Sequence, residues 1–275
     1  MLFPDHCILR KVCVFLGVLA YVWVPACAQA ELSSPETLKY YINRMEENRR
    51  HWIAINANLI LEFATPDKKI ASCHGELRYE RLSEKLLLKC LNDGDQLLFI
   101  FKSWDRDFEL YIPARETLFR GNIFQLQDSP EIESHLSALD LYRALKPVAI
   151  PYENSEIETI SEHLVTLNVY ARRPGENRHL YRRVSMTKTG HVVQEKYYAN
   201  DETPTVSIHR GKFQIVDDPA TKTQEAILFP HTILIESMEK PITTSLVFDH
   251  LEFPAGFSSE DWLFPIPEGT ATTEL

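Results

Sequence analysis

The stretch from Glu84 to Pro113 has the clearest alternation of apolar and polar positions in the chain. Two apolar runs flank Asp93-Gly94, a dipeptide that tolerates the positive φ angles of a tight hairpin turn. This turn would place Leu88 opposite Phe99, and a second turn predicted at Asp105-Arg106 would place Phe101 opposite Leu110. A shift of one residue would bring lysines and a glutamate onto the apolar face. The stretch therefore predicts an antiparallel meander with one apolar face.

The same alternation continues toward the N-terminus, in Ile53 to Phe63 and in Ile70 to Glu80. A turn near Arg81-Leu82 would place Cys73 opposite Cys90 on the neighbouring strand. All of these predicted strands then share one apolar face, which must be covered by another layer. The large apolar side chains of this face are Leu59, Leu61, Phe63, Leu77, Tyr79, Leu86, Leu88, Leu97, Phe99, Phe101, Phe108, Leu110 and Ile112.

Two amphipathic helices are predicted to cover this face. The first runs from Ser33 to Trp52, where Ser33 and Glu36 have the spacing of a capping box. The second runs from Ser129 to Lys146 and is followed by Pro147. Strand patterns then return up to Glu252, with turns expected at Gly190 and Gly211. The expected fold class is α+β and mainly antiparallel β: an open (half) β-barrel with helices covering its concave face.

Residues 1–30 resemble an export signal. Arg10 and Lys11 precede an apolar run, and the run ends before Ala28-Gln29-Ala30, a small-x-small cleavage site. An alternative is a lipoprotein signal in which Cys27 becomes the lipidated first residue. Either alternative predicts an exported protein, in the periplasm or anchored to the outer membrane through Cys27, with residues 31–275 as a single domain.

The charge balance argues against a nucleic-acid partner, because the chain has 29 basic and 39 acidic residues and a net charge of −10. Three of the five cysteines lie in the predicted signal, which leaves Cys73 and Cys90. In an oxidising compartment these two could form a disulfide, and two buried free thiols are the alternative.

No catalytic motif is present in the sequence. It has no Gly-rich phosphate loop, nucleophile elbow, His-Glu-x-x-His or Cys-x-x-Cys sequence. The histidines are too widely spaced to predict a metal site. Arg182-Arg183 is a basic pair that we expect on a solvated strand edge. The protein is therefore expected not to be an enzyme and to need no cofactor or metal.

Three stretches carry a family resemblance: Gly75 to Arg81, Ser103 to Pro113 and Trp262 to Gly269. They resemble the lipoprotein-localisation (Lol) factors, LolA and LolB, which are the periplasmic carrier and the outer-membrane receptor, and the third stretch resembles the closing strand of that family. The resemblance implies an open barrel closed by helices, with Arg81 at the position of the arginine that holds the carrier's lid closed. Leu82 departs from the carrier's proline, and Asp105 from its glycine. These departures suggest a divergent member of the family.

The resemblance implies a lipid-binding protein of the cell envelope, whose apolar face forms a cavity for the acyl chains of a lipoprotein or for another lipid. The expected partners are those acyl chains, an inner-membrane releasing complex and an outer-membrane acceptor, and the protein is expected to be a monomer. One alternative is an ordinary filled core in place of the cavity. The other is a non-transporting sensor or scaffold of the same fold that binds a protein partner.

Overall fold

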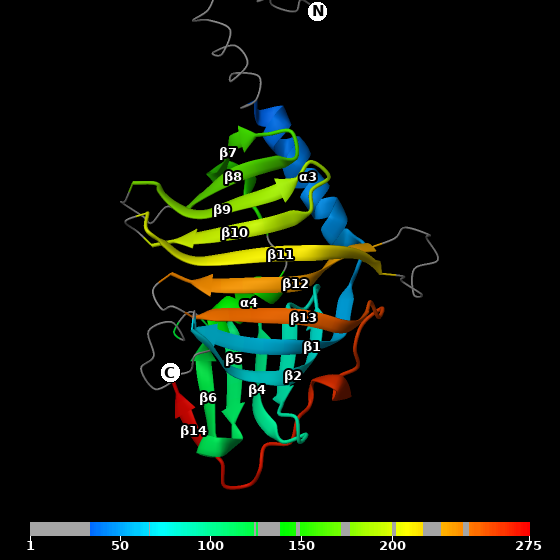
Figure 1. The fold of residues 1–275 in the computed structure, drawn as a ribbon, viewed down its shortest axis with the longest axis vertical. Coiled ribbons are helices and arrows are strands. Elements are labelled where there is room, and N and C mark those ends of the chain that lie inside the picture. Colours follow the sequence, from blue (N-terminus) through cyan, green and yellow to red (C-terminus); the bar gives the residue numbers. More distant parts are fainter. Residues whose placement is uncertain are drawn as a thin grey trace, which may run out of the picture.

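The computed structural model describes residues 34–65, 67–123, 125, 138–146, 149–171, 177–199, 202–216, 227–238 and 242–275. In these residues two α-helices accompany one large sheet (Figure 1). The helices are α3 (Pro35–Arg50) and α4 (Ala138–Leu145). The strands are β1 (Ala54–Thr65), β2 (Lys68–Glu80), β3 (Lys85–Leu91), β4 (Leu97–Trp104), β5 (Asp107–Ile112), β6 (Thr117–Asn122), β7 (Ser155–Ile160), β8 (Leu164–Ala171), β9 (His179–Thr187), β10 (Val192–Tyr198), β11 (Pro204–Val216), β12 (Ile227–Ser237), β13 (Thr243–Glu252) and β14 (Ala271–Glu274).

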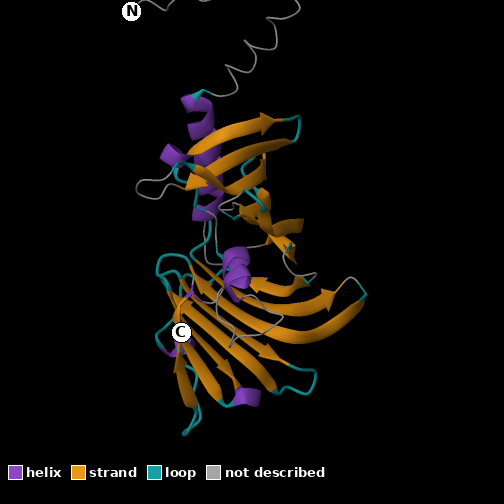
Figure 2. Ribbon diagram, turned by 90° about the vertical axis from the view of Figure 1, so that its left-hand side faces the viewer, coloured by secondary structure: helices purple, strands orange, loops and turns teal. Residues whose placement is uncertain are grey.

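The sheet consists of two meanders joined through β1 and β13. Its strand order is β14-β6-β5-β4-β3-β2-β1-β13-β12-β11-β10-β9-β8-β7, and every neighbouring pair is antiparallel except β14 and β6. The two end strands of this order, β14 and β7, are not paired with each other, so the sheet is open. Figure 2 shows the lower strands curving around α4. The expected mainly antiparallel, open-barrel fold is confirmed.

Helix α3 begins one residue later than the predicted cap. The side chain of Ser34, not Ser33, accepts a hydrogen bond from the Thr37 backbone N–H at 3.2 Å. The buried residues Leu38, Ile42 and Met45 form one stripe, as the periodicity predicts. They pack against β8 and β9 at the upper end of the sheet, where Val165, Leu167, Val184 and Met186 are buried. The prediction that this helix covers the first meander is therefore wrong.

Helix α4 lies over the concave face of the lower strands (Figure 2). Its buried residues Leu139, Tyr142 and Leu145 belong to the same apolar cluster as the inner face of β1 to β5. The predicted helix started at Ser129, and residues 129–137 lie outside the described part of the chain. Neither helix is long and apolar enough to cross a membrane in the described residues.

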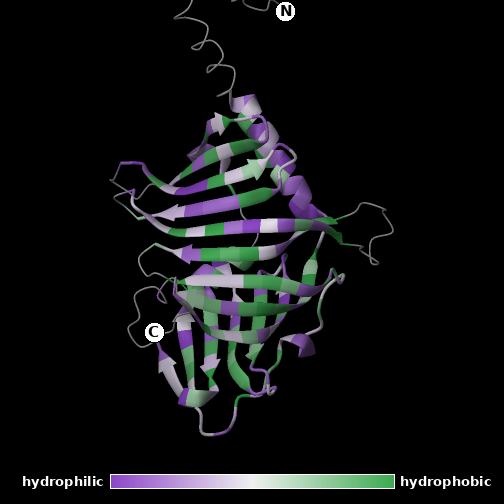
Figure 3. Cartoon of the chain, viewed as in Figure 1, coloured by the Kyte–Doolittle hydropathy of each residue, from purple (hydrophilic) through white to green (hydrophobic). Residues whose placement is uncertain are grey.

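The register between β3 and β4 differs by two residues from the prediction. Leu88 pairs with Phe101 and not with Phe99. A shift of two leaves the side chains from Phe99 to Ser103 on their predicted faces, because the side-chain period of a strand is two. Hydrophobic and hydrophilic residues accordingly alternate along the strands (Figure 3). Between β4 and β5 the prediction is confirmed, with Phe101 opposite Leu110.

The cause of this shift is the loop between β3 and β4. The Asn92 side-chain oxygen accepts hydrogen bonds from the backbone N–H groups of Gly94 and Gln96, both at 2.9 Å. Asp95, and not Gly94, adopts the left-handed conformation with φ of 58°. The loop is therefore longer than the two-residue turn that Asp93-Gly94 predicted.

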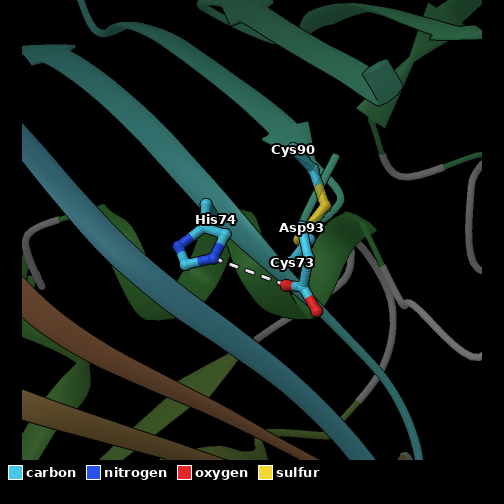
Figure 4. The surroundings of a disulfide bond; sticks show 4 residues. All are labelled: Cys73, His74, Cys90 and Asp93. Carbon is cyan, nitrogen blue, oxygen red and sulfur yellow. Dashed lines mark ion pairs between the residues drawn. A yellow bond between two sulfur atoms is a disulfide. The ribbon is translucent and has the colours of Figure 1, made fainter. Parts of the chain in front are cut away.

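The two cysteines form a disulfide across a diagonal of the β2–β3 ladder. Cys90 pairs directly with Gly75, so Cys73 lies two residues from the predicted position opposite Cys90. The bond joins Cys73 to Cys90 at a Cα separation of 5.7 Å (Figure 4). His74 points away from the bond, and its ring lies 3.5 Å from the Asp93 carboxylate. The structure therefore has a disulfide and not two buried free thiols.

Two further predictions are wrong. Gly211 is not a turn, because β11 continues through it and Gly211 pairs with Thr232 of β12. The closing strand expected over Trp262 to Gly269 is a short 3₁₀ helix (Glu260–Trp262) followed by an irregular segment, and β14 begins at Ala271. The patterns also did not predict β6, β7 or β14.

The C-terminal segment covers the outer face of the first meander. Trp262 is buried there with Leu87, Ile100, Tyr111 and Leu118. Leu97, which was predicted on the inner face, packs against this outer cluster instead. A register shift between Cys90 and Leu91 places Leu97 opposite Leu91, outside the alternation of the inner face. Both faces of these strands are therefore covered.

Candidate functional site

The inner face of the first meander brings most of the predicted cavity residues together. Phe99 and Ile112 pack at the edge of the inner cluster and are partly exposed. The buried members of the predicted set are Leu59, Leu61, Phe63, Leu77, Tyr79, Leu86, Leu88, Phe101, Phe108 and Leu110. These side chains contact one another and α4, so in this conformation they fill the concave face.

Helix α4 is a lid over this apolar face. A helix of eight residues is too short to be stable alone in water, so its position depends on its contacts. Its underside contributes Leu139, Leu141, Tyr142 and Leu145 to the inner cluster. Its remaining contacts to the sheet include several polar groups.

Two hairpin turns hold one side of α4. The Tyr142 hydroxyl donates a hydrogen bond to the backbone carbonyl of Asp105 in the β4–β5 turn, at 3.1 Å. The Lys146 ammonium donates to the Glu84 carboxylate in the β2–β3 turn at 2.5 Å and to the Tyr142 hydroxyl at 2.8 Å. The lid is thus linked to the ends of both hairpins.

A buried ion network holds the other side of α4. The Arg210 guanidinium donates to the backbone carbonyl of Ala144 at 3.0 Å and lies 2.6 Å from the Glu195 carboxylate. Glu195 is fully buried and is also 3.6 Å from Arg182, which donates to the carbonyl of Ala149. Buried charges are stable only when paired, so these residues form one unit. The prediction of a solvated Arg182 is wrong.

Tyr197 completes this network. Its hydroxyl donates to Glu195 at 3.2 Å, and the guanidinium of Arg143 from α4 lies 4.5 Å from its ring centre. Burial raises the pKa of the Tyr197 hydroxyl, with Glu195 adding to the effect, so Tyr197 remains a neutral donor. The network therefore contacts α4 both through a backbone carbonyl and through a side chain.

Arg81 lies at the junction of α3 with β1. Its guanidinium donates to the backbone carbonyl of Trp52 at 3.0 Å, just after the end of α3. Its backbone N–H donates to the carbonyl of Ile53 at 2.9 Å. The predicted gate residue is thus linked to the end of the first helix, whereas the polar contacts of α4 described above come from other residues.

A cavity of about 110 Å³ lies where the C-terminal ends of α3 and α4 meet the sheet. Its walls come from both helices, β1, β2, the β9–β10 turn and β10 to β13. Leu77 is the one predicted cavity residue among the side chains that line it. Aromatic rings dominate one wall, where Phe229 contacts Trp52 and Phe248 at centroid distances of 6.4 and 5.6 Å. The sequence prediction missed this cavity because its lining residues are scattered along the chain.

Several solved structures share this architecture at low sequence identity. A DUF1329 family protein from Desulfovibrio piger is 11% identical, with a TM-score of 0.60 over 82% of this chain and 97% of that chain. A LolA superfamily protein from Nitrosomonas europaea is 10% identical, with a TM-score of 0.56 over 82% and 97%. A Vibrio parahaemolyticus domain provisionally assigned to outer membrane lipoprotein sorting is 12% identical, with a TM-score of 0.57 over 80% and 95%.

The fold is that of a curved open sheet with a helix closing its concave side. No protein-family model and no curated protein matches the sequence. The structural likenesses identify the fold as a divergent form of the LolA-like fold.

Proposed function

We propose that the protein is a non-catalytic lipid-binding protein of the cell envelope, which shelters the acyl chains of a lipoprotein beneath α4 and transfers them toward the outer membrane. The observation that carries this proposal is the apolar inner face closed by a short helix with polar tethers. Hydrogen bonds of this kind contribute about 1 kcal/mol each, so the helix can be released stepwise. The exposed apolar face would then need an apolar ligand to cover it.

The energetics favour transfer between apolar sites and disfavour release into water. Enclosing an acyl chain is worth roughly 0.8 kcal/mol per buried methylene. Because side chains fill the inner face, α4 must move before a long chain can enter. The same barrier would keep a bound chain in place until an equally apolar acceptor is present.

The proposed cellular setting follows from the predicted export signal and the fold. The solved V. parahaemolyticus domain links this fold to lipoprotein sorting, which supports a place in the envelope. We propose an inner-membrane releasing complex and an outer-membrane acceptor as partners, with Arg81 as a gate residue at the α3–β1 junction. Cys27 and residues 1–30 lie outside the described part of the chain, so cleavage and lipidation stay predictions.

A native mass spectrum of the protein purified without detergent tests the proposal. Additional mass that leaves on gentle activation and fragments as an acyl lipid is the expected result. A ligand-free mass that persists after incubation with lipoprotein and with phospholipid would contradict it.

A pair of neighbouring substitutions tests where the lipid binds. Phe99→Glu places a carboxylate at the edge of the inner cluster, so we expect lipid retention to be lost. Leu98→Glu is the matched control, because Leu98 is 39% exposed and lies on the other face of the same strand. Circular dichroism shows whether each variant is folded. Equal retention by both folded variants would argue against binding at the inner face.

The tight filling of the interior favours a second candidate, a sensor or scaffold that binds a protein partner. The cavity of about 110 Å³ is small beside the roughly 300–1,000 Å³ of common ligand pockets. A Val192→Phe variant would reduce this cavity further. A scaffold would still form its stable complex, detected by cross-linking, whereas a lipid carrier would lose its cargo.

A further inference from the structure

The polar side chains that line the cavity are basic or neutral. Arg49, Lys146, Arg210, His191 and Asn48 contribute to the wall, and its described lining residues include no aspartate or glutamate. This composition contrasts with the chain as a whole, which has 39 acidic and 29 basic residues. The wall therefore has the charge that attracts an anion.

Two of these cations lie at the rim of the cavity. Arg49 is in the last turn of α3, and Lys146 directly follows α4. Their side chains are 22% and 28% exposed, whereas Arg210 is nearly buried and bound to Glu195 and to the Ala144 carbonyl. Arg49 and Lys146 are thus the pair that can reach a headgroup at the entrance.

The carboxylates that now neutralise these two cations can move aside. Glu46 lies 2.6 Å from Arg49, and Glu84 lies 2.5 Å from Lys146. Both glutamates are more exposed than their partners, at 34% and 44%, so they can turn into water at little cost. Burial lowers the pKa of Lys146, but hydrogen bonds with Glu84 and Tyr142 outweigh this effect and leave the pKa raised. Lys146 is therefore charged at neutral pH.

The size and walls of the cavity limit the rest of the ligand. Behind the rim, Phe229, Phe248 and Ile233 present apolar surface. A cavity of about 110 Å³ has room for the end of one hydrocarbon chain and not for several. The lining thus combines a narrow apolar interior with a cationic entrance.

We propose that this cavity binds one chain of an anionic amphiphile, whose carboxylate or phosphate pairs with Arg49 and Lys146 in place of Glu46 and Glu84. The inference rests on the proposed lipid-binding function and specifies the ligand's headgroup. A fatty acid and a phospholipid share this chemistry, because both combine an acyl chain with an anionic oxygen group.

Three probes with the same chain test the headgroup preference: dodecanoate, dodecyl phosphate and uncharged dodecanol. Calorimetric titration of the purified protein below the micelle concentration measures each affinity. We expect at least one anion to bind about tenfold more tightly than dodecanol, because charge-assisted hydrogen bonds are stronger than neutral ones. Preference for dodecanoate would indicate a fatty acid, and preference for the phosphate would indicate a phospholipid.

Substitutions test whether Arg49 and Lys146 cause the preference for an anionic headgroup. The double variant Arg49→Gln/Lys146→Gln is expected to bind the anions no better than it binds dodecanol. Arg44→Gln is the matched control, because Arg44 is on the same helix, pairs with Glu47 and is 48% exposed. Equal affinity of the original protein for all three probes, or an anion preference that survives in the double variant, would overturn this inference alone. Failure to bind any probe would also count against the proposed function.

Discussion

The absence of a side chain at Gly75 lets Leu59 and Leu61 pack closely against the backbone of β2. Gly75 pairs with Leu59, and a Cβ added to it would lie 2.6 Å from Leu61 Cδ1 and 2.9 Å from Leu59 Cδ1. Overpacking of a filled core costs about 1–3 kcal/mol, so Gly75→Ala is expected to lower the free energy of unfolding by this amount. Urea denaturation measures the change. Gly94→Ala is the control, because its added Cβ meets only Asn92 Oδ1 within 4 Å, at 3.4 Å, and an unchanged midpoint in both variants would contradict the argument.

Glu195 is the single carboxylate between Arg182 and Arg210 in the buried network. Glu195→Gln would leave both guanidiniums without their negative partner, and breaking a buried pair costs about 3–5 kcal/mol. We expect a correspondingly large fall in the unfolding free energy, measured by guanidinium denaturation. Glu236→Gln provides the comparison, since its pair with His209 is about two-fifths exposed and should matter by less than about 1 kcal/mol. Similar losses in the two variants would show that the network is not a stabilising unit.

Among the elements, helix α4 depends on the Tyr142 hydroxyl, which links the helix to the β4–β5 turn and to Lys146. Tyr142→Phe removes the donor to the Asp105 carbonyl and an acceptor for Lys146. Loss of about 1 kcal/mol corresponds to roughly fivefold more frequent opening of the helix. Hydrogen exchange of the α4 backbone amides measures this opening. Tyr170→Phe serves as control, because Tyr170 contacts Glu156 on the exposed side of β7 and β8, and equal exchange in both variants would contradict the lid model.

The faces of the strands were predictable from the sequence, whereas several pairings were not. Leu86, Leu88 and Phe101 lie on the predicted face because alternation alone determines a face. The pairing of Leu88 depends on how many residues the loop contains, and that number was decided by the Asn92 side chain and the left-handed Asp95. Hydrogen bonds within a loop of this kind are only weakly indicated by the residue types in the sequence.

The candidate site was harder to predict than the fold. Its cationic and ionic groups come from helix ends and from strands far apart in the chain. One pattern could have indicated the buried network: Arg182 alternates in phase with Leu180, Val184 and Met186, which are all buried. A charge in phase with an apolar stripe indicates burial with a partner. The identity of that partner still required the strand order.

For the molecule as a whole, the disulfide is the one covalent link between strands in the described residues. Cys73 and Cys90 are 17 residues apart, and closing a loop of this length contributes about 3 kcal/mol by restricting the unfolded chain. Reduction is therefore expected to lower the thermal midpoint, measured by calorimetry with and without reductant. A Cys73→Ala/Cys90→Ala variant should not respond to reductant. An unchanged midpoint of the original protein after verified reduction would contradict this expectation.

The path of the chain through the sheet also determines when the sheet can be completed during synthesis. The first meander lies between two partners that come last: β13 pairs with β1, and β14 pairs with β6. Its outer apolar cluster likewise needs Trp262. Until these final residues are available, both outer strands of the first meander lack partners and apolar surface faces water. The native sheet can therefore be completed only after β13 and β14, which come late in the order of elements, have been synthesised.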